Sequence, residues 1–279
     1  MSIELFRSQV ESELRLFIEK MGEKNQLRDA CEYALLNGGK RLRPILVVMI
    51  ADALDRGLNV MPVALSVEFF HTASLIADDL PCMDDDDERR NHPSLHKEFG
   101  ESVAILASYA LIAEGYGGIY RNSKMNPDAD AMLCLEAATR CAGIAGATNG
   151  QFLDLYPPDE SLETVKKILY QKTVTLFEIS FIFGWIFGGG NSDRLEEVKL
   201  CAYHLGRAFQ IADDLIDGVQ DVGTINIAAA CGREEAFRLF QEEISLFTES
   251  LNSLGLWTKS FQEVVRFLKE YGTAPSAAP

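Results

Sequence analysis

An acidic stretch, residues 78–90 (DDLPCMDDDDERR), holds the side chains best suited to chemistry. Six of its thirteen residues are Asp, one is Glu, and it ends in two adjacent Arg. It follows the apolar run 63–77, so its carboxylates stand at the end of an element that should be buried. Crowded carboxylates repel one another unless hard cations neutralise them. Mg²⁺ is often held by one or two carboxylates plus phosphate oxygens, and Arg is a forked phosphate donor. The stretch therefore predicts a magnesium–phosphate site; a solvated acidic loop is the alternative.

A second acidic cluster lies 135 residues further on, where Asp213, Asp214 and Asp217 end another apolar helical pattern. Asp213 and Asp217 are four residues apart and share a helix face, where like charges destabilise a bare helix. This cluster also favours a cation. Two such clusters facing each other across a helical bundle could hold several Mg²⁺ ions and one polyanion between them.

The elements that must position these clusters are helices. Apolar residues recur at helical spacing almost throughout, and no period-2 run is long enough to indicate a strand. The sequence predicts one all-α domain over residues 1–271, a bundle of roughly ten helices around a central cavity, with a loose tail at 272–279. The expected helices are residues 2–21, 26–37, 44–54, 62–79, 102–120, 128–153, 161–187, 193–217, 233–252 and 256–271.

Composition narrows the function classes. The chain has 279 residues and a net charge of −16, which argues against a nucleic-acid partner. Its six Cys show neither disulfide-framework nor zinc-ligand spacing, so we expect reduced thiols in a cytoplasmic protein. The most apolar run, 173–190, is interrupted by Glu178 and too short for a convincing membrane span. The N-terminus has no apolar core of signal type.

Several motifs together resemble those of the short-chain trans-isoprenyl diphosphate synthases, the farnesyl/geranylgeranyl diphosphate synthase family. The resemblance covers nearly the whole chain. It implies an all-α fold, usually a homodimer, that joins an allylic diphosphate head to tail with isopentenyl diphosphate, using up to three Mg²⁺. The motifs are GGKRLRP at 38–44, the acidic stretch at 78–90, HKEFGE at 96–101, GQFLD at 150–154, Lys172-Thr173, and FQIADDLID at 209–217.

The resemblance also implies roles for individual residues. The metal ligands would be Asp78, Asp79 and Asp84 on the first motif and Asp213, Asp214 and Asp217 on the second. Arg89 would contact the allylic diphosphate, and Lys172 would stabilise the departing pyrophosphate. The isopentenyl diphosphate would be held by Lys40, Arg43, His71 and Arg90, and the allylic carbons would lie near Thr173 and Gln210. Gln151 and Asp154, one turn apart, could serve the site or the structure, and core packing is the simpler role for Phe209.

The implied chemistry suits these residues. Ionisation of the allylic carbon–oxygen bond leaves a carbocation and pyrophosphate, and fixed cations stabilise the charge on the leaving group. An apolar cavity protects the carbocation from water. The isopentenyl double bond then attacks, and a proton is lost. No protein nucleophile is needed, which agrees with the lack of a nucleophile–base motif.

The chain departs from the family pattern at four places. Ala77 stands where His usually precedes the first Asp pair, Ser108-Tyr109 replaces Gly-Asp, and Asn91-His92 replaces Gly-Lys or Gly-Arg. The usual Gly-Lys after the second motif has no counterpart, because no Lys occurs between Asp217 and Arg233. One cation of the leaving-group cage is therefore missing.

Product length should depend on the positions four and five residues before the first motif. Ser74 lies one helical turn from Asp78, and the resemblance adds Ala73 as part of the tunnel floor. Both are small, which favours geranylgeranyl diphosphate as the product, with farnesyl diphosphate second. Two other functions stay open: a weakly active or non-catalytic partner subunit of a prenyl synthase, and a terpene cyclase or lyase on the same frame. A cyclase would not need the cations expected to bind isopentenyl diphosphate.

Overall fold

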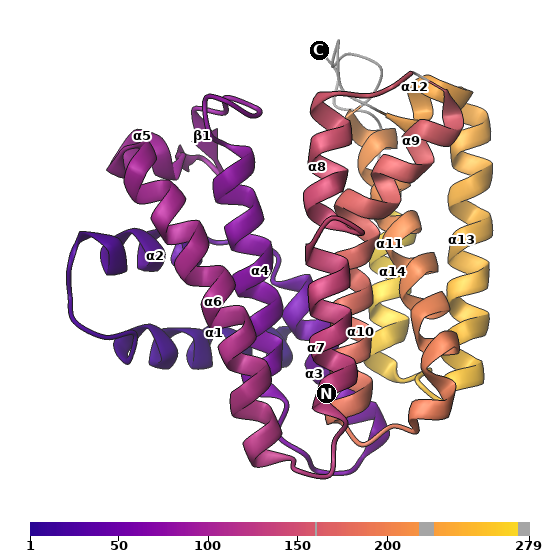
Figure 1. Cartoon of the computed structure of the whole chain (residues 1–279). Helices are drawn as coiled ribbons and strands as arrows, with labels where there is room; N and C mark the ends of the chain where they lie inside the picture. The colour runs from indigo at the N-terminus through magenta and orange to yellow at the C-terminus, as the bar shows by residue number, and fades with distance from the viewer. Residues whose placement is uncertain (160, 218–225, 273–279) are drawn as a thin grey trace.

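The computed structural model describes residues 1–159, 161–217 and 226–272, and it confirms an all-α fold (Figure 1). The only strands among these residues are β1 (Glu88–Arg89) and β2 (His92–Pro93), which form one hairpin. The longer helices are α1 (Ile3–Glu19), α2 (Gln26–Leu36), α3 (Leu42–Leu54), α4 (Met61–Asp78), α6 (Glu101–Met125), α7 (Ala131–Ala142), α8 (Ala147–Leu155), α9 (Leu162–Leu169), α10 (Thr175–Phe187), α11 (Leu195–Asp217), α13 (Arg233–Leu254) and α14 (Lys259–Gly272). The shorter ones are α5 (Leu95–Phe99), η1 (Tyr170–Val174), η2 (Ser192–Arg194) and α12 (Ile227–Cys231).

The helices form two groups that meet along the middle of the molecule (Figure 1). The N-terminal group, drawn in indigo and magenta, contains α1, α2, α4 and α6, with α4 packed along the length of α6. The second group contains α8 to α14, with α11 packed along α13. Helix α10 joins the groups, because it packs against α3, α4, α7 and α11. All thirteen of its residues are buried, so the run 173–190 is a core element, as the sequence indicated.

Two of the expected helices differ from the structure. Residues 128–153 are two helices, α7 and α8, because the chain turns between Gly143 and Gly146. A side chain at Gly146 would place its Cβ 1.9 Å from the carbonyl oxygen of Cys141, so only glycine allows this close return of the backbone. The expected helix 161–187 is continuous, but it contains a π-helical turn, η1, between α9 and α10.

Helix α6 has an unusually apolar outer surface for a helix of its length. Among the described residues it is the one helix long and apolar enough to cross a membrane by length and composition, a test that core helices of soluble proteins also pass. Only 39% of its most apolar window is buried. Leu106, Tyr109 and Ile112 are exposed on it. The expected tail cannot be compared, since residues 273–279 lie outside the described part of the chain.

Candidate active site

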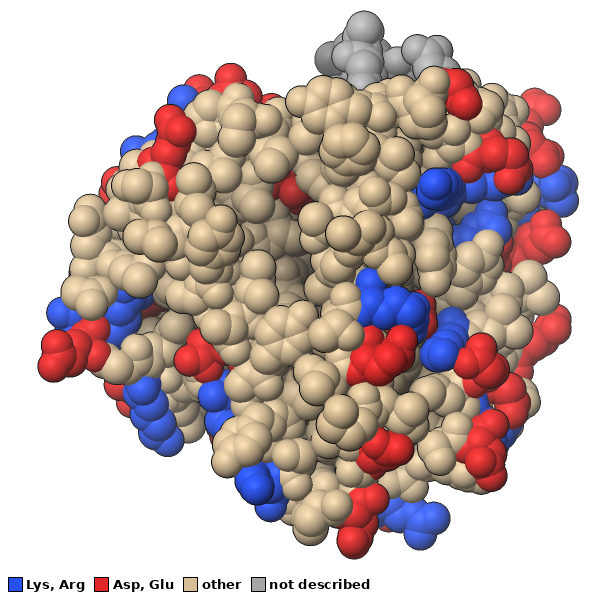
Figure 2. Space-filling view, in the orientation of Figure 1, with Lys and Arg blue, Asp and Glu red and all other residues tan. Residues whose placement is uncertain are grey.

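An apolar cavity of about 560 Å³ lies between α4, α6, α8 and the π turn. Figure 2 shows the surface hollowed between the two groups of helices, with few charged residues around the opening. Asp78 and Lys172 line it together with apolar side chains from all sides. Ala73 and Ser74, which were expected to set the product length, also line it, and so does Ser108. The charged groups and the apolar wall that the chemistry needs therefore meet in one cavity.

The first acidic motif begins where α4 ends and then turns back on itself. Asp78 is the last residue of α4, and its carbonyl oxygen accepts a hydrogen bond from the backbone N–H of Asp84 at 2.9 Å. The turn thus returns Asp84 to the start of the motif, although five residues separate the two. Burial raises the pKa of Asp78 to about 7; the charge of Lys172 opposes this rise, and those of Asp84 and Asp79 add to it. A carboxylate that is costly to charge in the free protein is one that a cation would stabilise.

The hairpin β1–β2 sends its two arginines in different directions. Its two-residue turn consists of Arg90 and Asn91, with φ of 57° and 64°, as a type I′ turn requires. Asn tolerates this left-handed conformation, which explains how Asn91 can stand where the family usually has Gly. Arg89 pairs with Asp79 and, at 2.7 Å, with Asp86.

Arg90 instead lies against the backbone of the 38–44 loop. Its guanidinium donates to the carbonyl oxygen of Gly38. A Cβ at Gly39 would lie 2.6 Å from the Arg90 Cζ atom, so the guanidinium occupies the space that a side chain would take.

The second acidic motif ends α11. Asp213 is half-buried, whereas Asp214 is buried with both carboxylate oxygens engaged. The side chain of Gln210 donates to one oxygen at 2.9 Å, and the backbone N–H of Ile227 donates to the other at 2.7 Å. Asp214 thus ties the end of α11 to the start of α12. The side chain of Asp217 and residues 218–225, where the family lysine would stand, lie outside the described residues.

The π turn brings together the residues expected at the leaving group. Lys172 donates to Asp154 and lies 3.9 Å from Asp84. Burial by itself would lower the pKa of Lys172, but Asp154 and Asp78 raise it overall, so this lysine is charged. Thr173 donates to Gln210 at 2.9 Å, which links the turn to the second motif. Single π-helical turns within an α-helix are often found at functional sites.

Four cationic or basic side chains were expected to hold the second diphosphate, and two of them are in direct contact. The Arg43 Nη1 and His71 Nε2 atoms are 3.3 Å apart. The buried Arg43 Nε and His71 Nδ1 atoms have no hydrogen-bond partner among the described residues. Burial, and then the charges of Arg43 and Arg90, hold the pKa of His71 well below its ordinary value, so its imidazole is neutral. Unsatisfied buried donors of this kind suit an anionic ligand.

Supporting residues complete the site, and the sequence only partly pointed to them. Asp154 pairs with Lys172, and Gln151 donates to Asp84 at 2.9 Å, so both contact residues expected at the site. Arg41 is fully buried with φ of 51°, and it pairs with Glu68 and, at 2.7 Å, with Glu11. Nothing in the local sequence separates this structural arginine from its neighbours Lys40 and Arg43.

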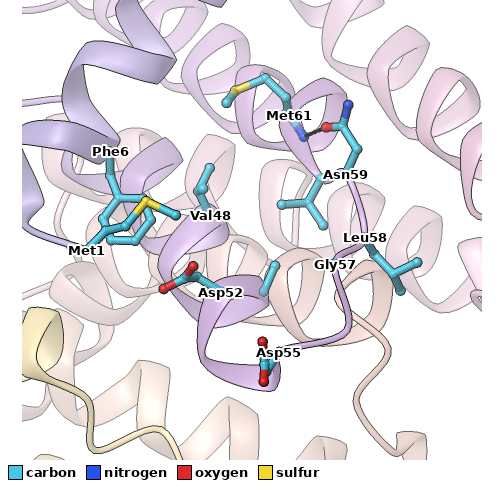
Figure 3. A pocket seen from close by; sticks show the side chains of 11 residues that line it. Met1, Phe6, Val48, Asp52, Asp55, Gly57, Leu58, Asn59 and Met61 are labelled. Carbon is cyan, nitrogen blue, oxygen red and sulfur yellow. Dashed lines mark hydrogen bonds between the residues drawn. The ribbon is translucent and has the colours of Figure 1, made fainter.

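Two other features are less suited to a diphosphate. A cavity of about 200 Å³ between α1 and the end of α3 is lined by Asp52 and Asp55 and by no Lys, Arg or His (Figure 3). Among the described residues, metal-binding atoms converge within 4.8 Å only at Asp85, Asp87 and His96. Lys97 already pairs with Asp87 there at 2.6 Å. The expected ligands on the first motif are spread among their own lysine and arginine partners instead.

Comparisons with known proteins identify the family of this chain. The polyprenyl synthetase family model matches residues 24–229, and the chain belongs to that family. It is 38% identical over 199 residues to an Arabidopsis thaliana chloroplastic geranylgeranyl pyrophosphate synthase, covering 68% of this chain and 56% of that protein. It is 36% identical over 212 residues to the Bacillus subtilis farnesyl diphosphate synthase, covering 75% of this chain and 72% of that protein.

Structural similarity covers more of the chain than these sequence alignments do. An FPP/GFPP synthase from Zymomonas mobilis, solved in its apo form, superposes with a TM-score of 0.84 at 31% identity. The superposition covers 95% of this chain and 98% of that one. The two relatives found by sequence differ in the product that their names give, so similarity alone does not assign a chain length.

Proposed function

We propose that this protein is a magnesium-dependent prenyltransferase that condenses an allylic diphosphate with isopentenyl diphosphate. One observation carries the proposal: Asp78 and Lys172 line an apolar cavity with Asp84 3.9 Å from Lys172, while Arg43 and His71 form a separate, unsatisfied basic group. Such an arrangement suits two diphosphates bound side by side, one of which departs. Its test is incubation with isopentenyl diphosphate and one allylic primer at a time, with and without Mg²⁺, followed by sizing of the dephosphorylated products.

The proposed metal site fits the chemistry of its residues. Clustered carboxylates, one of them with a pKa raised to about 7, are the oxygen donors that Mg²⁺ prefers. Asp78, Asp79, Asp84 and Asp213 would hold the ions, with Asp214 and Asp217 beside them. Bound Mg²⁺ would supply the positive charge that stabilises the leaving diphosphate. Up to three ions would be bound.

The chain's own residues would do the rest. Lys172 and Arg89 would contact the allylic diphosphate, with bound ions neutralising Asp84 beside Lys172 and Asp79 beside Arg89. Thr173 and Gln210, joined by a hydrogen bond, would lie beside the allylic carbons. The apolar wall would exclude water from the carbocation. Arg43, His71, Lys40 and Arg90 would hold the isopentenyl diphosphate through the reaction.

For the product we propose geranylgeranyl diphosphate first and farnesyl diphosphate second. Ala73 and Ser74 leave room along α4, and Ser108 keeps Ala73 in place by donating to its carbonyl oxygen at 3.0 Å. The next large groups along the cavity are Phe70 and Tyr116, whose ring centroids are 5.1 Å apart in an edge-to-face pair. Phe70 lies eight residues before Asp78, or about 12 Å along a helix.

Replacement of Ala73 tests this reading of the cavity. Ala73→Tyr would place a ring between the acidic motif and the Phe70–Tyr116 pair, so the product should shorten by at least one isoprene unit. Chromatographic sizing of the dephosphorylated products measures this directly. An unchanged product length would mean that the growing chain does not run along α4.

A partner subunit is the second candidate function. It is favoured by the sequence that follows the second motif, which has no Lys between Asp217 and Arg233. Arg233 does not replace that lysine, because its guanidinium donates to the carbonyl oxygen of Leu215 at 2.6 Å. Loss of product with every primer, together with co-purification of an active synthase, would support this function. The assembled Arg43–His71 group argues against a terpene cyclase, which binds one diphosphate.

We also propose a homodimer in the cytoplasm. The exposed apolar side chains Leu106, Tyr109 and Ile112 on α6 and Met132 on α7 support the proposal, because a protein in water rarely leaves such a group uncovered. Tyr109 stands where the family usually has Asp, and it is 64% exposed. Sedimentation of the wild type beside Tyr109→Asp tests the interface: the variant should shift toward monomer.

A further inference from the structure

Two cations of the proposed isopentenyl diphosphate site, Lys40 and Arg43, differ in their partners from the third, Arg90, which donates to the carbonyl oxygen of Gly38, and from nearby cations that pair with carboxylates. Lys172, Arg89 and Arg41 each pair with at least one carboxylate. Lys40 and Arg43 make no ion pair within 4 Å in the part of the chain that the structure describes. Both lie over aromatic rings instead.

The rings form two contacting pairs, one in the core and one on α14, and Lys40 lies between the two pairs. The Arg43 guanidinium lies 4.6 Å from the ring centroid of Phe177, and the Phe177 and Phe209 centroids are 5.5 Å apart. Lys40 Nζ lies 5.6 Å from the Phe209 centroid and 4.2 Å from that of Tyr271. Phe267 completes the set, 5.8 Å from Lys40 Nζ and stacked on Tyr271 at 14°. We call Phe177, Phe209, Phe267 and Tyr271 the ring ladder.

A ring holds a cation without neutralising it. The face of an aromatic ring attracts a cation through its quadrupole but carries no net charge. A carboxylate that pairs with the same cation neutralises its charge, and an incoming anion must then displace that carboxylate. Lys40 and Arg43 are therefore held in place with their full charge available to a ligand.

The ladder also limits how freely Lys40 moves. Lys40 follows Gly38 and Gly39, whose φ values of 80° and 114° belong to a loop that glycine alone adopts easily. A flexible four-carbon side chain on such a loop loses much conformational entropy when it binds a ligand. Three ring faces around its Nζ atom would restrict the Lys40 side chain in the free protein, so less conformational entropy would be lost on binding.

We propose that the ring ladder positions Lys40 and Arg43 for isopentenyl diphosphate, and that α14 is thereby part of this binding site. The inference rests on the proposed function, which assigns that substrate to these cations. Phe267 and Tyr271 act as positioning residues: they touch the lysine and not the substrate. Phe209, for which core packing was the simpler expectation, both packs against Phe177 and lies beneath Lys40.

Calorimetric titration of isopentenyl diphosphate tests the proposal, because it measures binding whether or not the protein turns over. Tyr271→Leu keeps an apolar group but removes the ring face, and it should raise the Kd about threefold to tenfold. Tyr271→Phe keeps the ring and should restore the wild-type Kd. Tyr120→Leu is the matched control, since Tyr120 lies beneath Lys124 at 5.3 Å on α6, away from the site. The Kd for farnesyl diphosphate with Mg²⁺ should not change in any of the three.

The outcomes separate this inference from the function on which it rests. If Lys40→Met leaves the Kd for isopentenyl diphosphate unchanged, the assignment of Lys40 fails and the inference with it. If Lys40→Met weakens binding but Tyr271→Leu does not, the ladder has no positioning role. Equal weakening of both diphosphates by Tyr271→Leu, or equal weakening by Tyr271→Phe, would also overturn the proposal, because a general structural effect would explain it. If the wild type forms no product but these Kd changes are as expected, the proposed catalytic activity is refuted and the positioning role of the ring ladder is retained.

Discussion

The two sides of the site hold their cations in opposite ways. On the side of the acidic motifs, Lys172 and Arg89 stand against carboxylates. On the other side, Lys40 and Arg43 stand over rings. The first pair can serve a diphosphate only when something else neutralises those carboxylates, whereas the second pair is available at once. Under the proposed function, this difference predicts that binding of the allylic diphosphate depends on metal and that binding of isopentenyl diphosphate does not.

The largest expected effect is that of metal removal. With EDTA present we expect product formation to fall below detection and binding of farnesyl diphosphate to be lost. Binding of isopentenyl diphosphate should stay within about twofold, because an uncompensated Arg or Lys binds phosphate without a bridging ion. Calorimetry with each diphosphate measures both, and excess Mg²⁺ should restore turnover. Equal loss of the two affinities would break the comparison.

The next effect concerns Lys172 alone. Lys172→Met removes a fixed charge at the leaving group, and we expect kcat to fall about 100-fold to 1,000-fold, as for other preorganised donors. The Kd for isopentenyl diphosphate should not change. Lys166→Met, at a half-buried lysine paired with Glu163 on the preceding helix, is the matched control and should keep wild-type kcat. A small effect on kcat would mean that Asp154 holds Lys172 for the fold and not for the chemistry.

A smaller effect is expected on the side of the rings. Arg43→Lys keeps the charge but loses the flat group that lies on Phe177 and the contact with His71. We expect the Kd for isopentenyl diphosphate to rise about tenfold, which corresponds to about 1.4 kcal/mol of binding free energy. The measurement is the same titration, with farnesyl diphosphate as the unaffected ligand. An unchanged Kd would show that charge alone suffices at this position.

The smallest effect concerns the turn that separates Arg89 from Arg90. Asn91→Val puts a β-branched residue at φ of 64°, and the free energy of unfolding in urea should fall by about 1–3 kcal/mol. Asn91→Gly should keep the wild-type stability, since glycine accepts this conformation readily. The Val variant should modestly weaken the binding of both diphosphates, because the turn directs Arg89 toward one diphosphate site and Arg90 toward the other. Weakening of only one would mean that the two arginines are positioned independently.

The features that the sequence could predict are local ones. The acidic motifs are short, and their place at the ends of apolar helices follows from the helical period, as the structure confirms for Asp78 and Asp213. The fold class and the small residues along the cavity follow in the same way. A helical apolar pattern followed by charged residues predicts these features without any knowledge of contacts to residues far along the chain.

Other features depend on contacts that no short pattern contains. The ring ladder joins Lys40 to Tyr271, which are far apart in the chain and share no local signal. The π turn reads as ordinary helix, because its apolar residues keep an almost regular period. Asp214 looks like its neighbour Asp213, and only the backbone N–H of Ile227 shows that it ties two helices together. Glu178 gave a visible signal, an acid in the most apolar run, but its role is an ion pair at 2.7 Å with the half-buried Arg140.

The π turn makes the site unusually vulnerable to a change in length. Its first four side chains reach four different places: Tyr170 to Glu178, Gln171 to Asn149, Lys172 to Asp154 and Thr173 to Gln210. Loss of one codon here would restore a regular helix, and each residue before it would rotate by about 100° relative to α10. The fold and the acidic motifs would survive, but those four contacts could not all be kept. In evolution, deletion of one residue in this turn would therefore be enough to remove the activity while every charged residue of the acidic motifs is kept.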